Sequence, residues 1–110
     1  MRTSAVDVTT RRDGTVVMRL HGDLGQETAV EFRQVLVRAV RRIRPTRLVL
    51  DLADVSSVDS INLGTVAAAC QLGDDHQVIV MVENPSAALT DRLTAAGVPS
   101  ERLRRATVIC

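Results

Sequence analysis

Residues 48–64, with the sequence LVLDLADVSSVDSINLG, decide the fold class. The segment Arg47–Leu52 is almost continuously apolar, which is typical of a central strand that is covered on both faces. Ala53–Val58 is expected to connect this strand to a helix that begins near Asp59 and Ser60. The apolar positions of that helix recur at helical spacing: Leu63, Val66, Ala67 and Cys70. A buried strand that leads into an amphipathic helix predicts an α/β protein.

The residues before this stretch predict a β-hairpin and a first helix. Val6–Val8 and Thr15–His21 have strand character and flank a turn at Asp13-Gly14. Gly22–Gly25 is expected to form a loop. A helix then begins near Thr28, where Thr28 and Glu31 have the spacing of a capping box, and it ends at Pro45. Its apolar stripe consists of Phe32, Val35, Leu36, Ala39, Val40 and Ile43.

The residues after the stretch predict a strand, a third helix and a last strand. Gln77–Val82 has the composition of a buried strand. Asn84 is expected to cap a helix with Pro85 at its first position, and Gly97 to end that helix. Its inner face is formed by Leu89, Leu93 and Ala96. With a short strand at Thr107–Ile109, the sequence predicts one domain over residues 1–110. We expect a mostly parallel sheet of about five strands, opened by a β-hairpin, with helices packed against it.

Composition excludes several classes of function. The chain has 110 residues, a net charge of +1 and a single aromatic residue, Phe32. Single-stranded nucleic acids are usually bound by stacking on aromatic side chains, so that function is not expected. Arg38, Arg41, Arg42 and Arg44 are interpreted as a solvated helix end, where basic residues favour the helix dipole. Without an N-terminal apolar segment or a long apolar run, we expect no secretion and no membrane insertion, and hence a cytoplasmic protein.

The metal-ligating and nucleophilic side chains form no pattern typical of an enzyme, so we expect no catalysis, no metal site and no cofactor. His21, Cys70, His76 and Cys110 could ligate a metal, but none is paired at a zinc-site spacing. No phosphate loop, nucleophile elbow or dinucleotide fingerprint is present. Cys70 is interpreted as a small core residue. The alternative is a Cys70–Cys110 disulfide, which would make partner binding sensitive to oxidation.

Two segments carry a resemblance to a known family. Residues 48–64 resemble the signature of the STAS family, in which a strand ending in Asp-Leu is followed by a short loop and Asp-Ser-Ser-Gly-Leu-Gly. Gly22-Asp23-Leu24-Gly25 is similar to the family's Gly-Glu-Leu-Asp. Three positions depart from the pattern: Gly25 replaces Asp, Ile61 replaces the second Ser, and Asn62 replaces Gly. The chain also ends at Cys110, before the last helix of most relatives.

The resemblance implies an anti-sigma factor antagonist. Such proteins bind an anti-sigma factor, commonly a serine kinase, and thereby free a sigma factor for transcription. Phosphorylation of the family's second Ser breaks the complex, because about two negative charges enter a packed interface. Here Ile61 has no hydroxyl, so Ser60 is the candidate phosphosite, although capping of the helix by Asp59 or Ser60 also explains these residues.

The implied partner surface combines two segments: Asp23, Leu24, Gly25, Ser57, Asp59, Ser60, Ile61, Asn62, Leu63 and Gly64. Two other functions are compatible with a STAS-like domain. One is a subunit of a membrane transporter or lipid-transport complex, which needs no serine phosphorylation. The other is a small-nucleotide-binding module, for which no phosphate loop is present.

Overall fold

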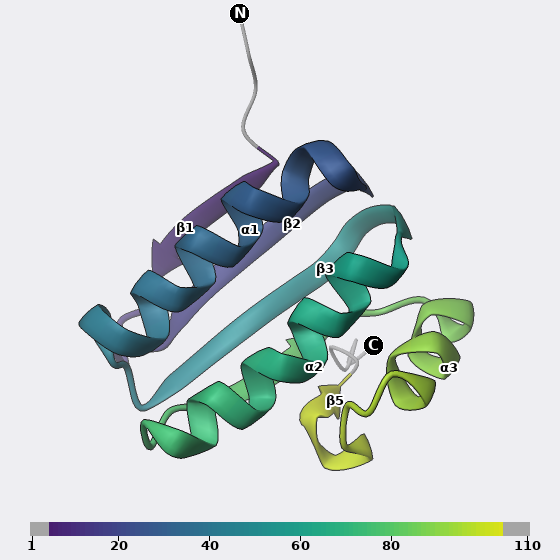
Figure 1. Cartoon of the computed structure of the whole chain (residues 1–110). Helices are drawn as coiled ribbons and strands as arrows, with labels where there is room; N and C mark the ends of the chain where they lie inside the picture. The colour runs from purple at the N-terminus through teal and green to yellow at the C-terminus, as the bar shows by residue number, and fades with distance from the viewer. Residues whose placement is uncertain (1–4, 105–110) are drawn as a thin grey trace, which may run out of the picture.

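The computed structural model describes residues 5–104 and contains one five-stranded sheet. Its strands are β1 (Val6–Thr10), β2 (Val16–Leu24), β3 (Arg47–Val58), β4 (Ile79–Glu83) and β5 (Leu103–Arg104). They lie side by side in chain order (Figure 1). β1 and β2 form an antiparallel hairpin, and the other neighbouring pairs are parallel. The expected α/β fold with an opening hairpin is therefore confirmed.

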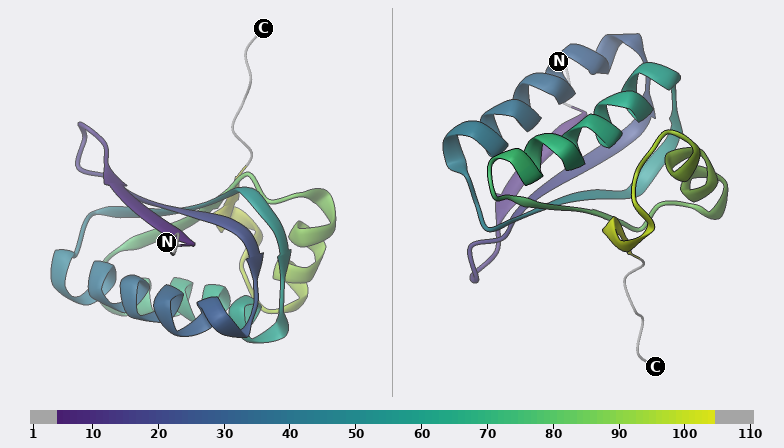
Figure 2. Two further views of the ribbon diagram at one scale, coloured as in Figure 1. Left: turned by 90° about the horizontal axis from the view of Figure 1, so that it is seen from above. Right: turned by 60° about the horizontal axis from the view of Figure 1, so that its bottom comes forward.

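Two long helices cover one face of the sheet. α1 (Gln26–Arg38), which continues into the π-helical turn η1 (Ala39–Ile43), lies beside α2 (Ser60–Asp75) (Figure 2). α3 (Ala87–Ala95) lies next to α2 and is followed by the short helix η2 (Ser100–Arg102). The guanidinium of Arg92 in α3 donates to the backbone carbonyl of Val58, 2.6 Å away, and so holds α3 against the end of β3.

The main core lies between the sheet and its helical cover. Its largest fully buried side chains include Phe32 from α1 and Met18, Leu20, Leu48 and Leu50 from the strands. Burial of such aliphatic and aromatic side chains stabilises the fold by about 2 kcal/mol each. β3 is buried on both faces, as predicted. On the face without helices, however, Val49 packs in a small separate cluster with Val17 and Met81.

Both central strands are longer than the sequence predicts. β2 continues through residues 22–24, expected to form a loop, and β3 through residues 53–58, expected to connect to a helix. The two segments pair with each other, as in Leu24 opposite Val58, after two irregularities in the register. Leu24 and Val58 are both buried. Pairing between the two strands satisfies the backbone N–H and C=O groups of both segments. The residue pattern of one segment taken alone does not reveal this pairing.

The first helix begins two residues earlier than expected, whereas its predicted end at Pro45 is confirmed. Its N-cap is Gly25, and Thr28 is the third residue inside, where its Oγ1 accepts the Gly25 N–H at 3.1 Å. Arg44, with a φ of 49°, ends η1 just before Pro45. Ile43, predicted on the buried stripe, is 53% exposed. A π-helical turn contains more residues than an α-helical turn, so the side chains in η1 no longer follow the period of 3.6 that the prediction assumes.

The third helix also starts later than predicted. Ser86, and not Asn84, is its N-cap, and the Ser86 hydroxyl accepts the Leu89 N–H at 3.1 Å. Asn84 has a φ of 61° and precedes the helix with Pro85. Leu89 and Leu93 are buried as expected, whereas Ala96 is exposed because the helix ends there. Gly97 follows with a φ of 107°, as expected for a glycine that ends a helix.

The last strand of the described chain is β5, next to β4. The strand predicted at Thr107–Ile109 lies outside the described residues. No helix among residues 5–104 is long and apolar enough to cross a membrane.

Candidate functional site

The carboxyl ends of β2 and β3 bring the two family-like segments together. Because these strands are parallel, both end at the same edge of the sheet and lead into α1 and α2. The Ser57 hydroxyl donates to the Asp23 carboxylate at 2.8 Å. The backbone N–H of Asp59 donates to the Leu24 carbonyl at 2.9 Å. The structure thus places the predicted segments around Asp23 and Asp59 side by side (Figure 1).

Asp59 alone caps α2. Its Oδ1 accepts the backbone N–H of Asn62 at 2.9 Å, which satisfies a donor that the first turn of a helix leaves free. The carboxylate also lies at the positive end of the helix dipole, which favours its charge. Ser60, the other candidate, therefore does not cap the helix. It is the first residue of the helix and is exposed.

Asn62 connects the starts of both helices. Its side chain is 0% exposed, and its Nδ2 donates to the Gly25 carbonyl at 3.1 Å and to Asp59 Oδ1 at 2.8 Å. Its Oδ1 is buried and has no hydrogen-bond partner among residues 5–104. Gly25 is the N-cap of α1, so one amide holds the two helix starts at a fixed separation. The sequence analysis names Asn62 as a departure from the family's Gly and as a residue of the partner surface, but the structure buries it. Its position three residues after the cap is the signal for its contact with Asp59.

The predicted surface residues divide into exposed and buried groups. Ile61 is 60% exposed. Asp23, Ser57, Ser60 and Gly64 are also exposed. Leu24 and Leu63 belong to the core instead. They can pack beneath the residues of a binding surface, but they cannot contact a partner themselves.

The other chemical candidates are not brought together. Among residues 5–104, no three His, Cys, Asp or Glu side chains are placed to hold a metal ion. His21 lies between two carboxylates, 2.7 Å from Asp7 and 3.6 Å from Asp54. Cys70 is 3% exposed, and burial raises the pKa of its thiol, which disfavours the reactive thiolate. Cys110, its predicted disulfide partner, lies outside the described residues.

Comparison with known proteins gives the family. The model of the STAS domain matches residues 8–107, so this chain belongs to the STAS domain family. No curated protein matches the sequence. The fold is similar to that of SpoIIAA from Bacillus in its phosphorylated form, with 21% identity over 94% of this chain and 92% of that one, and a TM-score of 0.78.

Two further solved structures share the fold. A variant of RsbS from Moorella thermoacetica is 16% identical over 96% of this chain and 89% of that one, with a TM-score of 0.77. A sulfate transporter family protein from Wolinella succinogenes is 16% identical over 87% of this chain and 80% of that one, with a TM-score of 0.71. Domains with this fold therefore occur in both regulatory and transport proteins.

Proposed function

We propose that this chain is an anti-sigma factor antagonist that binds an anti-sigma factor of the serine-kinase type and thereby frees a sigma factor. It acts in the cytoplasm, without catalysis, cofactor or nucleic acid. The similarity to SpoIIAA, described as an anti-sigma factor antagonist, extends over 89% of that chain in its unphosphorylated form. A match over most of such a protein supports the same kind of role.

The observation that carries the proposal is the exposed Ile61 at the start of α2. Removing a side chain of this size from water stabilises a complex by up to about 2 kcal/mol. Asp23, Ser57 and Ser60 contribute exposed polar side chains to the same predicted surface. An apolar anchor with a polar rim is the usual composition of a protein–protein interface.

The same position bears on control by phosphorylation. Ile61 stands where the family's signature has its phosphorylated Ser, and it cannot accept a phosphate. Ser60 has an exposed hydroxyl, but successive helical residues point about 100° apart around the axis. A phosphate on Ser60 would therefore occupy a different part of the surface. We propose that the chain binds its partner without the usual phosphorylation switch.

A titration with the anti-sigma factor of the same organism tests the proposal. The change Ile61→Glu is expected to weaken binding about 100-fold, because the interface would bury an unpaired charge. Ile43→Glu is the matched control, since Ile43 is comparably exposed but is the last residue of η1, far from the start of α2. It should leave the affinity unchanged. Equal affinities of the Ile61→Glu variant and the unchanged protein would contradict the proposal.

A second candidate function is that of a STAS subunit in a membrane transporter or lipid-transport complex. The similarity to the Wolinella sulfate transporter family protein favours it, because most of that chain is matched as well. Affinity purification from the native cell distinguishes the two candidates. Recovery of a histidine-kinase-like ATPase supports the regulator, and recovery of transporter subunits supports the second candidate.

A further inference from the structure

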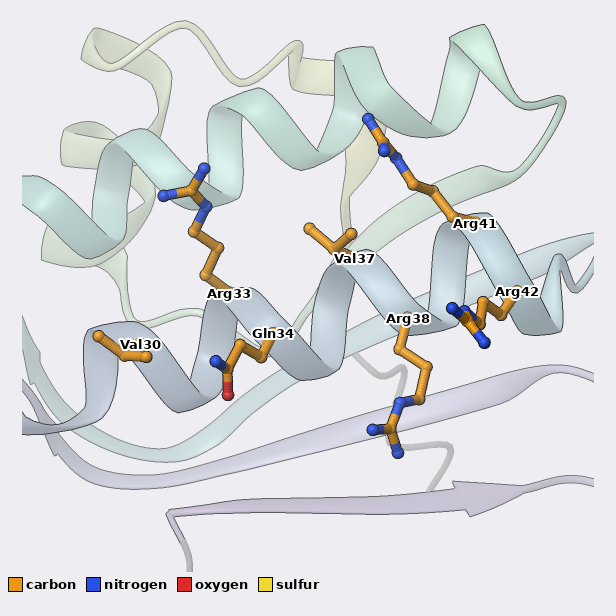
Figure 3. Close-up of a pocket in the computed structure, with 7 residues that line it drawn as sticks. All are labelled: Val30, Arg33, Gln34, Val37, Arg38, Arg41 and Arg42. Carbon is orange, nitrogen blue, oxygen red and sulfur yellow. The ribbon is translucent and has the colours of Figure 1, made fainter.

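The outer surface of α1 and η1 carries two parallel rows of side chains. One row consists of Val30, Gln34, Arg38 and Arg42, and the other of Arg33, Val37 and Arg41. Within each row the residues are four positions apart, so they form ridges along the helix. The trough between the ridges encloses about 560 Å³ and is lined by these seven residues (Figure 3).

A second groove lies on the other side of the Arg33–Val37–Arg41 row. It encloses about 810 Å³ between α1 and α2, and its lining is mainly apolar, with Leu36, Ala68 and Leu72 among its residues. Figure 3 shows Arg33 and Arg41 pointing toward α2, with Val37 between them. The groove extends to Ile61 at the start of α2. One ridge of side chains therefore separates two hollows on the same face.

The charge on this face is strongly one-sided. Arg33, Arg38, Arg41 and Arg42 line the grooves, and none takes part in the ion pairs found among the described residues. The carboxylates of α1, Glu27 and Glu31, line neither groove. Asp75 is the one acidic side chain in the groove linings. Four neighbouring guanidinium groups raise the affinity of this face for anionic groups.

We propose that this face, the arginine groove, binds an amphipathic helix of another protein that carries Asp and Glu beside its apolar stripe. A hollow between two rows with four-residue spacing accepts the side-chain ridge of a second helix. The apolar stripe would cover Val30 and Val37, and the flanking carboxylates would pair with the arginines. Arg matches carboxylate geometry with two hydrogen bonds, which favours a carboxylate-bearing partner. The proposal is independent of which protein binds the start of α2.

A designed peptide provides the test. The probe is a fluorescently labelled helical peptide with Leu at every third and fourth position and Glu on both sides of the Leu stripe. Its control carries Lys in place of each Glu. Binding to the full chain is followed by fluorescence anisotropy, and the site by backbone amide NMR shifts. We expect the Glu peptide to bind, to shift the amides of α1 and the facing side of α2, and to lose affinity above about 0.5 M salt, where charges are screened.

Matched variants test the role of the arginines. Arg33→Glu with Arg38→Glu should weaken Glu-peptide binding by about tenfold or more and should favour the Lys peptide. Glu is a good helix former, so α1 should persist, and circular dichroism verifies this. Arg12→Glu with Arg47→Glu makes the same change of charge away from the groove and should have no effect.

Three outcomes of these experiments would overturn the proposal, and a fourth would come from the vesicle measurement below. The first three are equal binding of the Glu and Lys peptides, amide shifts confined to other elements, and self-association of the chain through the same face in sedimentation. A parallel measurement uses vesicles of phosphatidylglycerol and phosphatidylcholine. If the arginines mediate binding to these vesicles and not to the peptide, the face recognises a membrane surface and the protein-helix proposal is wrong.

Discussion

Replacing Gly73 by Ala should destabilise the protein, although Ala is normally the better residue within a helix. Gly73 lies in α2, where the helix crosses β4. A Cβ at this position would be 2.5 Å from the backbone oxygen of Val78 and 2.6 Å from Cγ2 of Val80. The local backbone is also fixed, because the Gly73 carbonyl accepts the N–H groups of His76 and Val78 at 2.9 and 2.8 Å. The added methyl group can therefore be accommodated only if α2 moves away from the strand.

The magnitude follows from two opposing contributions. Ala in place of Gly favours the helix by about 1 kcal/mol. Overpacking against a buried strand costs about 1–3 kcal/mol, and weakening the Val78–Gly73 hydrogen bond costs about 1 kcal/mol more. We therefore expect the free energy of unfolding to fall by about 2 kcal/mol. Gly64→Ala is the matched control on the same helix, because no atom lies within 4 Å of its added Cβ. It should raise the stability by about 0.5–1 kcal/mol.

Urea denaturation followed by circular dichroism measures both variants against the unchanged protein. The expected result is a pair of changes with opposite signs at two glycines nine residues apart in one helix. Equal stabilisation by the two substitutions would refute the close approach of α2 to β4. Because this contact sets the position of α2 on the sheet, the refutation would extend to the placement of Ser60 and Ile61.

Three further predictions concern the residues of α2. Asp59→Ala removes the helix cap and should lower the free energy of unfolding by about 1 kcal/mol in urea denaturation; no change would contradict the capping role. Ser60 should gain no stoichiometric phosphate from the anti-sigma kinase and ATP, and intact mass with peptide mapping checks this. In a Cys110→Ser variant, Cys70 should react with iodoacetamide only slowly in the folded protein. Burial raises the pKa of the Cys70 thiol above its usual 9.0. The contribution of Cys70 to the free energy of unfolding is therefore complete below pH 9 and is lost as the pH rises through the folded-state pKa. A free energy of unfolding that does not depend on Cys70 in this pH range would argue against its burial.

The sequence predicts the architecture well where a single segment determines its own structure. The continuous apolar run of β3 is a local signal and is confirmed. A cap at the start of α2 is expected from Asp59 or Ser60, and the structure selects Asp59. The prediction fails where structure depends on a distant partner. Residues 53–58 have no strand pattern of their own but extend β3 because residues 21–24 pair with them. Ile43 is exposed because a π-helical turn, which the period of 3.6 does not anticipate, redirects it.

The candidate site shows the same division. The sequence identifies the two segments around Asp23 and Asp59, and the parallel pairing of β2 and β3 brings them together. It does not reveal that the buried Asn62 amide holds both helix starts, because that contact spans 37 residues. Leu63 lies on the apolar stripe predicted for this helix and Ile61 does not, and the structure buries the first and exposes the second.

The most direct test of the proposed function is the release of a sigma factor in a purified system. The sigma factor and anti-sigma factor of the same organism are combined as a complex, and this chain is added in increasing amounts before size-exclusion chromatography. We predict that the sigma factor is released as the chain forms a complex with the anti-sigma factor, and that the Ile61→Glu variant releases little. An anti-sigma factor that keeps its sigma factor at saturating concentrations of the folded chain would contradict the account.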